Sequence, residues 1–237
     1  MRVAALADIH GNLPALEAVL ADLEQENVDA VAVVGDSVSG PWPAEVFDLL
    51  TDVEARIVRG NADRLDEVTR FDSAQASWNE ERLGADRLAT VAEWPLTIEL
   101  EIAGLGNALL CHSTPTSDEP IYTRATPDDE LIALFGSVVA DVLVCGHTHM
   151  QYDRRLSNGL RVLNPGSVGM PYEGRPGAFW VLLGPDVEFR HTEYDVEAAV
   201  RAIRALDGPV QEQQLELLVE PMGSEAATAE FEKLRGA

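Results

Sequence analysis

The 237-residue sequence lacks the long apolar segments of membrane-spanning and secreted proteins. Its opening stretch, "MRVAALADIHG", holds only five apolar residues in a row before Asp8, which is too short for a secretory signal. No later run approaches the length of a membrane span. We therefore expect a soluble, cytoplasmic protein with no membrane partner.

Basic residues are scarce as well. The chain has 17 Lys and Arg against 41 Asp and Glu, a formal net charge of -24. Such a chain repels polyanions at long range, which excludes a broad nucleic-acid-binding or anionic-membrane surface. A small phosphate-bearing substrate is not excluded, because bound metal ions reverse the field inside a pocket.

Cysteine is nearly absent: Cys111 and Cys145 are the only two. Each ends an apolar run typical of a buried strand, so we predict buried, reduced thiols rather than a disulfide or a redox pair. Apolar residues make up 46% of the chain, and its length suits one large domain with a sizeable core.

The first sixty residues alternate between apolar runs and helical periodicity. Strands are expected at 2–7, 29–35 and 55–60, and helices at 13–25 and 43–52. This alternation predicts an α/β layered core with parallel strands.

The second half is expected to be antiparallel. Strand pairs are predicted at 96–104 with 106–112, at 151–156 with 160–164 and at 177–184 with 187–195, beside a buried strand at 141–146. Two polar helices broken near Gly84 should occupy 73–94, and further helices 127–138 and 196–206. We predict one domain at 1–207 with a helical insertion near 64–95, and an acidic helical extension at 208–237.

Polar residues that could bind metal follow five of the predicted strands. Sites in open α/β sheets form beyond the carboxyl ends of strands. Residues two apart in an extended backbone point to one side, which applies to Asp8 with His10 and to His147 with His149. The candidate ligands are Asp8, His10, Asp36, Asn61, His112, His147 and His149.

Each of these residues alone has an ordinary explanation. A histidine at a strand end is commonly solvated, and an Asp or Asn after Gly commonly forms a turn. Their joint occurrence is different, because crowded carboxylates and imidazoles are costly unless cations bind them. The fifth histidine, His191, lies in an alternating strand and is predicted to be structural. Seven ligands exceed one tetrahedral zinc site and suit two metals that share a bridging carboxylate.

The ordered motifs Asp8-x-His10, Gly35-Asp36, Gly60-Asn61, His112 and Gly146-His147-Thr148-His149 resemble those of the calcineurin-like metallophosphoesterases. "NPGSVG" at 164–169 is similar to the bacterial small-phosphodiesterase branch of that family. The resemblance covers roughly residues 1–195. It implies a four-layer αββα sandwich of two mixed sheets flanked by helices.

The resemblance also implies a role for each motif residue. Asp8, His10 and His149 would hold one metal ion, Asn61, His112 and His147 a second, and Asp36 would bridge the two. Asp36, Asn61 and His112 would be catalytic. Asn12 would touch the substrate phosphate or support the site from behind, and the loop around Ser167 would shape the rim.

The implied activity is hydrolysis of a small-molecule phosphodiester or phosphomonoester by a hydroxide between the two metals, with Asn61 stabilising charge on the phosphate. The ligand types favour Mn or Fe, with Zn possible, over Mg or Ca. Two alternatives stay open: a non-catalytic scaffold of the same fold, and a protein serine/threonine phosphatase.

The sequence departs from the family pattern at two positions. Strongly active members usually have Gly-Asn-His followed by Asp or Glu, whereas this chain has Gly60-Asn61-Ala62-Asp63. The histidine that would assist the leaving group is therefore missing, and Asp63 is left to cap a helix or bind water. Ser113 follows His112 where Gly is usual, and we expect it to tighten the loop.

Overall fold

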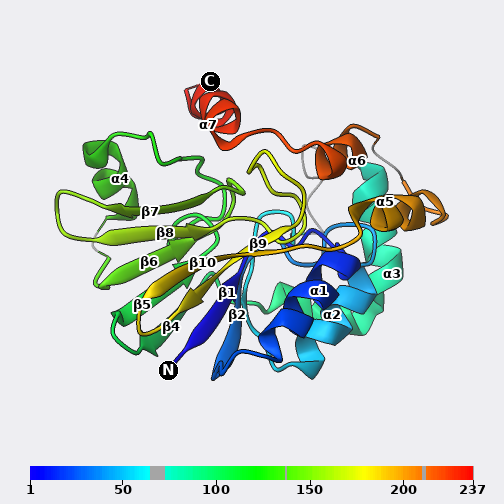
Figure 1. Ribbon diagram of the computed structural model, residues 1–237, viewed down its shortest axis with the longest axis horizontal. Coiled ribbons are helices and arrows are strands. Elements are labelled where there is room, and N and C mark those ends of the chain that lie inside the picture. Colours follow the sequence, from blue (N-terminus) through cyan, green and yellow to red (C-terminus); the bar gives the residue numbers. More distant parts are fainter. Residues whose placement is uncertain (65–72, 137, 210–211, 237) are drawn as a thin grey trace.

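A computed structural model describes residues 1–64, 73–136, 138–209 and 212–236 (Figure 1). The described strands are β1 Val3–Leu6, β2 Ala30–Val34, β3 Arg56–Val58, β4 Thr97–Ile102, β5 Gly106–Cys111, β6 Val142–Cys145, β7 Gln151–Arg155, β8 Arg161–Pro165, β9 Ala178–Leu183 and β10 Val187–Thr192. The described helices are α1 Leu13–Leu23, α2 Pro43–Asp52, α3 Ser73–Ala92, α4 Asp128–Phe135, α5 Val196–Arg204, α6 Glu212–Val219 and α7 Ser224–Arg235.

The strands form two mixed sheets of five strands each. The first has the order β10-β9-β1-β2-β3 and the second β4-β5-β6-β8-β7. Strands β1, β2 and β3 run parallel, as do β5, β6 and β8, while β9, β10, β4 and β7 pair antiparallel at the flanks. The parallel strands therefore form one side of the first sheet, up to its edge at β3, and the centre of the second.

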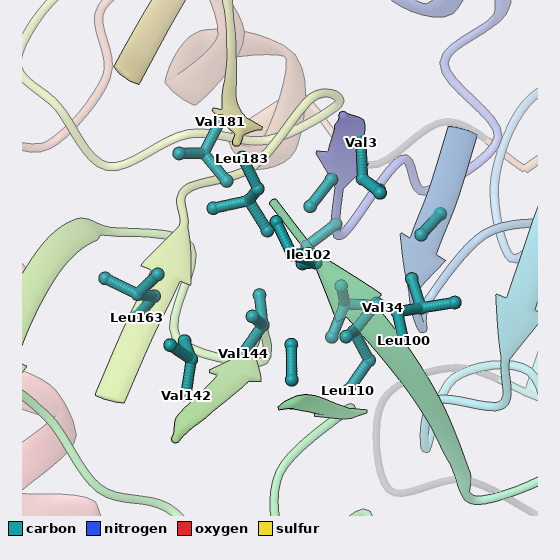
Figure 2. Packing of buried hydrophobic residues seen from close by; sticks show 14 of the residues in the cluster. Val3, Val34, Leu100, Ile102, Leu110, Val142, Val144, Leu163, Val181 and Leu183 are labelled. Carbon is teal, nitrogen blue, oxygen red and sulfur yellow. The ribbon is translucent and has the colours of Figure 1, made fainter. Parts of the chain in front are cut away.

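The two sheets pack face to face through an apolar core (Figure 2). In β1, Val3 and Ala5 point into this core, while Ala4 and Leu6 point to the opposite face and pack against α1. Both faces of the strand are buried, which is why its sequence is apolar throughout rather than alternating.

Helices cover the outer faces of both sheets. Leu16 and Val19 of α1 and Val46 of α2 pack on the first sheet, and Leu131 and Phe135 of α4 pack on the second. The predicted four-layer αββα sandwich is confirmed.

The expectation that the second half of the chain is antiparallel is wrong for its central strands. Although β7 and β8 form the expected hairpin around Asn158-Gly159, β8 also pairs parallel to β6, and β6 parallel to β5. A hairpin is visible in local sequence, but the sheet neighbour on its other side is not. The predicted break at Gly84 is confirmed, since this residue has φ 70° and ψ 167° within α3.

The C-terminal helices lie outside the sandwich. Helix α6 packs on α5 through Leu215 and Leu218, and α7 lies apart from both (Figure 1). Both helices lie within 208–237, the range predicted as an extension, and the division of the chain into a domain at 1–207 and this extension stays a prediction. Of the predicted insertion near 64–95, residues 65–72 lie outside the described residues. Within the described ranges, no helix combines the length and apolar character needed to cross a bilayer.

Candidate metal centre

The candidate ligands follow the carboxyl ends of the parallel strands in sharply bent backbone. Asp8, His10, Asp36, His147 and His149 have φ values of 52°, 48°, 52°, 70° and 58°. Residues other than glycine rarely adopt this left-handed region, and doing so costs about 1–2 kcal/mol each. The expected extended backbone at these pairs is therefore wrong, and the bends decide where each side chain points.

The first group consists of Asp8, His10 and His149. The Nε2 atoms of His10 and His149 are 3.2 Å apart, and His149 Nε2 is 3.5 Å from Asp8 Oδ1. One ligand atom from each residue lies within 4.8 Å of the other two. Asp8 is fully buried and His149 nearly so.

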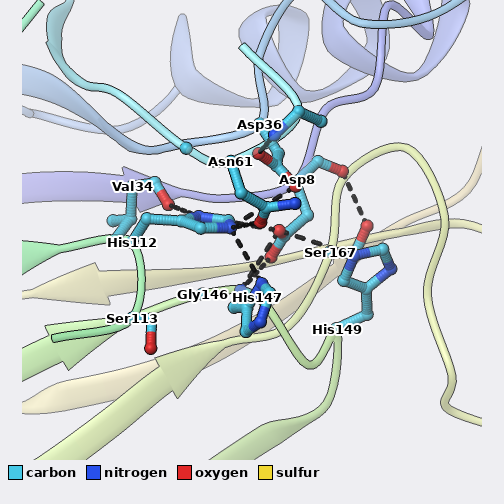
Figure 3. A network of polar contacts seen from close by, with 12 residues as sticks. Asp8, Val34, Asp36, Asn61, His112, Ser113, Gly146, His147, His149 and Ser167 are labelled. Carbon is cyan, nitrogen blue, oxygen red and sulfur yellow. Dashed lines mark hydrogen bonds and ion pairs between the residues drawn. The ribbon is translucent and has the colours of Figure 1, made fainter. Parts of the chain in front are cut away.

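The second group consists of Asp36, His112 and His147, with Asn61 beside them. His112 Nε2 lies 3.1 Å from His147 Nδ1, 3.0 Å from Asn61 Oδ1 and 3.4 Å from Asp36 Oδ2. In the view of Figure 3, His112 and His149 lie on opposite sides of Asp8. His147 and His149 thus belong to different groups, although spacing alone placed them on one side.

Asp36 lies between the two groups. Its Oδ2 is 3.4 Å from His112 Nε2 and 3.7 Å from His10 Nε2, and its Oδ1 accepts a hydrogen bond of 2.8 Å from the Ala62 amide. Gly60 permits this approach, because a Cβ at that position would lie 2.1 Å from Asp36 Oδ1. The Gly60-Asn61 motif therefore requires glycine at its first position, because any larger residue would clash with Asp36.

Burying these carboxylates and imidazoles together shifts their pKa values in opposite directions, because burial disfavours the charged form of each group. Burial raises the pKa of Asp8 well above its ordinary value and lowers those of His10 and His149. Burial also lowers the pKa of His147, to about 4. For His112 the effect of burial is outweighed by attraction to Asp36 and Asp8, which raises its pKa to about 10.

The donor set fits divalent cations. His112 Nδ1 donates to the Val34 carbonyl at 2.9 Å, and His149 Nδ1 donates to the Met170 carbonyl at 2.7 Å. These bonds direct Nε2 of each ring toward the other ligands, the arrangement typical of metal-ligating histidines, and a cation bound there would take the place of the Nε2 proton of His112. In each group two imidazole nitrogens face each other at 3.1–3.2 Å. A cation bound by both nitrogens suits this arrangement better than a hydrogen bond between the two rings.

The "NPGSVG" loop holds the ligand loops in place. Ser167 Oγ donates to the Asp8 carbonyl at 2.7 Å, and Asn164 Nδ2 donates to the Gly146 carbonyl at 2.7 Å. Both side chains are fully buried. The loop therefore ties the Asp8 segment to the segment that carries His147 and His149.

Asn12 is engaged within the protein. Its Nδ2 donates to the Gly169 carbonyl at 3.0 Å and to the Tyr194 hydroxyl at 3.1 Å, and its Oδ1 accepts from the Ala15 amide as the N-cap of α1. These contacts favour the supporting role; direct contact with a substrate phosphate stays a prediction.

Asp63 has a role that the sequence did not reveal. Its carboxylate accepts hydrogen bonds from the amides of Ser37, Val38 and Gly60 at 2.9–3.1 Å. Asp63 thereby joins the loop after Asp36 to the loop that carries Asn61. No local pattern could show the contacts with Ser37 and Val38, because these residues are distant from Asp63 in the sequence.

Ser113 closes the loop after His112, as expected. Its Oγ donates to the Pro120 carbonyl at 2.5 Å, and its own carbonyl accepts from the Tyr122 hydroxyl at 2.6 Å. Cys111 and Cys145 are buried and free, as predicted, with their Sγ atoms 3.6 Å apart, and the absence of a redox role for the pair stays a prediction.

His191 lies apart from both ligand groups. It is on β10, where its Nε2 bonds the Pro176 carbonyl at 2.9 Å and its ring contacts that of Phe179. The structural role predicted for it agrees with these contacts.

Comparisons with known proteins agree with this geometry. A family model described as the calcineurin-like phosphoesterase superfamily domain matches residues 1–183. An uncharacterized protein, MJ0912, of Methanocaldococcus jannaschii is 27% identical over 85% of this chain and 91% of its own. Phosphodiesterase YfcE of Escherichia coli K12 is 28% identical over 77% of this chain and 87% of its own.

Solved structures share the fold. A metallophosphoesterase from Sphaerobacter thermophilus superposes with a TM-score of 0.72 at 26% identity, over 92% of this chain and 98% of its own. The hypothetical protein PH1004 from Pyrococcus horikoshii OT3 reaches a TM-score of 0.81 at 22% identity, over 94% and 99% of the two chains.

Proposed function

The chain belongs to the calcineurin-like phosphoesterase superfamily, and from that membership we propose that it is a binuclear metal-dependent phosphodiesterase acting on a small-molecule phosphate ester. The observation that carries the proposal is the position of Asp36 within 3.4 Å of His112 and 3.7 Å of His10, between two groups of ligands. A single shared carboxylate between two sets of imidazoles suits a pair of cations.

We assign the ligands to two ions. Asp8, His10 and His149 would hold one, Asn61, His112 and His147 would hold the other, and Asp36 would bridge them. The two groups support this division, because each gathers its ligand atoms within 4.8 Å. Bound there, the two ions would supply Lewis acidity and lower the pKa of a water held between them.

Asn61 can contact the substrate phosphate, and three of the histidines are in the state that binds cations. Asn61 Oδ1 faces His112, so its Nδ2 is directed to the other side, where it can donate to a phosphate oxygen. The neutral state favoured for His10, His147 and His149 leaves these rings free to bind cations rather than protons. The imidazole-rich set favours Mn or Fe, with Zn possible.

A diester is the favoured substrate class. Ala62 stands where a proton-donating histidine is usual in the family, and a good leaving group needs no such donor. The relative named as a phosphodiesterase supports the same class. Aryl diesters fit the missing donor best, whereas cyclic nucleotides and dinucleotides, whose leaving groups are alkoxides, are candidates if water or another side chain supplies the proton.

The test is a hydrolysis assay on the full chain, stripped by a chelator and resupplied with Mn, Fe(II), Zn or Mg. The substrates are bis-(p-nitrophenyl) phosphate, p-nitrophenyl phosphate, 2′,3′-cyclic nucleotides and a phosphoserine peptide. We expect Mn-dependent cleavage of diesters, and elemental analysis should give two metal ions per chain. His147→Ala should abolish turnover, whereas His191→Ala, the same change outside the ligand groups, should not.

Two outcomes would reverse the proposal in different ways. Two bound metals without turnover of any ester would indicate the non-catalytic scaffold. Turnover of the phosphopeptide alone would indicate a protein phosphatase.

A further inference from the structure

The ring of Tyr172 covers one face of the His149 imidazole. Their centroids are 5.2 Å apart and their planes are inclined by only 12°, so the rings are stacked. The Tyr172 amide also donates to the His149 carbonyl at 3.2 Å. Tyr172 follows the "NPGSVG" loop, and its contact with a candidate ligand is not predicted by any local sequence pattern.

His149 needs such a neighbour. Its hydrogen bond from Nδ1 to the Met170 carbonyl, 2.7 Å long, fixes the tautomer and one point of the ring. A single hydrogen bond leaves the ring free to tilt about that contact. A flat group packed on its face removes this freedom, so the Met170 carbonyl and Tyr172 together define where Nε2 points.

Tyr172 is supported from behind by the C-terminal helix. The ring of Phe231, on α7, lies 5.9 Å from that of Tyr172 at an angle of 55°. Figure 1 shows α7 beside the loop that joins β8 to β9, apart from α5 and α6. The Gly174 amide of that loop donates to the Met222 carbonyl just before α7, at 3.1 Å.

Helix α7 is anchored at two further points. The hydroxyls of Thr123 and Thr126 both donate to Glu232 Oε1, at 2.6 and 2.5 Å. Thr228 Oγ1 lies 3.4 Å from the sulfur of Met150, the buried residue directly after His149. The helix therefore contacts the loop after β5, the His149 segment and the Tyr172 loop at once.

We propose that Tyr172 and α7 position His149, so that the C-terminal extension is part of the metal centre. Tyr172 fixes the plane of the imidazole, and Phe231 keeps Tyr172 in contact with it. Both act through His149 and are positioning residues. The proposal rests on the proposed function, because it assumes that His149 binds one of the two ions.

The competing explanation is that the Tyr172–Phe231 contact only attaches α7 to the domain. In that case its loss would loosen the helix and leave metal binding unchanged. The two explanations differ in the affinity of one ion, which can be measured without any substrate.

The experiment is calorimetric titration of Mn²⁺ into the full chain after chelator treatment. The variants are Phe231→Ala, Tyr172→Leu and Tyr172→Phe, and the matched control is Leu234→Ala, which removes a 60% exposed side chain from the same helix. We expect Phe231→Ala and Tyr172→Leu to weaken one Mn²⁺ site by about 10- to 100-fold and spare the other, since lost supporting contacts of metal ligands have effects of this size. Tyr172→Phe keeps the ring and should match the wild type, as should Leu234→Ala.

Unchanged affinity at both sites in Phe231→Ala and Tyr172→Leu, with far-ultraviolet circular dichroism of the wild type, would overturn the positioning role and leave the proposed function intact. Absence of Mn²⁺ binding by the wild type would overturn both. Should Tyr172→Leu fail to fold, Phe231→Ala decides, because it changes only the outlying helix.

Discussion

Asp36 is the residue whose position makes the sharpest prediction. Asp36→Asn should lower kcat/KM for a nitrophenyl diester by about 10²–10³-fold, because an amide bridges two cations poorly and forfeits the negative charge between them. The amide oxygen can still accept the Ala62 hydrogen bond, so the fold should persist. The assay uses saturating Mn²⁺, with Asp153→Asn on the exposed face of β7 as the control. Near-full activity of Asp36→Asn would exclude the bridging role.

A substitution at Ala62 tests whether the protein lacks a proton donor for the leaving group. Ala62→His should speed cleavage of alkyl diesters more than that of nitrophenyl diesters, because only poor leaving groups need protonation. We expect a gain near 10²-fold, the low end for general acids, since Asp63 is bound to three amides and is not available to orient the new ring.

The measurement is the dependence of rate on leaving-group pKa in both proteins. Ala62→Leu supplies bulk without a proton and serves as the control. An equal dependence on leaving group before and after Ala62→His would reject the missing-donor account.

For individual residues, the sequence predicted which side chains come together but not how they divide between the two groups. The strand-end positions of Asp8, Asp36 and His112 follow from apolar runs that stop at a polar residue. The separation of His147 from His149 does not follow, because it depends on left-handed backbone at both residues. The contacts of Asp63 with Ser37 and Val38 and of Tyr172 with His149 were also missed, since these partners are distant in sequence.

Among the elements, α7 offers a test of pH dependence through Glu232. Burial raises the pKa of this carboxyl, but hydrogen bonds from Thr123 and Thr126 and the contact with Arg235 outweigh it and hold the pKa below 4.5. A lowered pKa means that the charged form stabilises the fold above pH 4.5. That contribution is lost as pH falls through the folded-state pKa.

Glu232→Gln should therefore be less stable than the wild type at pH 7, by about 1 kcal/mol. The difference should shrink as the pH falls below 4.5. Urea unfolding of both proteins between pH 7 and pH 3 measures it. A difference that stays constant across this range would show that the charge of Glu232 does not contribute.

Helix bounds and breaks that depend on nearby residues were predictable from the sequence, whereas the pairing of strands distant in the chain was not. The helix at 43–52 begins at Pro43 and ends as its periodicity predicts, and Gly84 breaks α3 where a residue with positive φ is needed. The parallel pairing of β8 with β6 was missed, because no pattern within 160–164 specifies the strand on the far side.

For the whole molecule, the metals should be a large part of stability. A ligand at 100 times its dissociation constant adds about 2.7 kcal/mol to the free energy of unfolding. For a chain of this size that corresponds to roughly 5–10 °C in Tm for each ion, or about 10–20 °C for the two together. Chelator treatment should lower Tm by that amount and Mn²⁺ should restore it.

Thermal unfolding followed by circular dichroism checks this prediction. His147→Ala should retain only part of the Mn²⁺ effect, because one set of ligands remains intact. A Tm that does not respond to chelator or Mn²⁺ would contradict the presence of two ions in the native protein.

The neighbours of β1 have a consequence for how the chain folds. This strand pairs with β2, close in sequence, and with β9, near the other end: Val3 lies opposite both Ala30 and Leu183. Until β9 has been synthesised, one edge of β1 has no partner, and exposed strand edges recruit other chains. Closing so long a loop is also slow. The ribosome-bound or newly released chain is therefore the form most exposed to aggregation, and chaperones that shield strand edges should raise its yield.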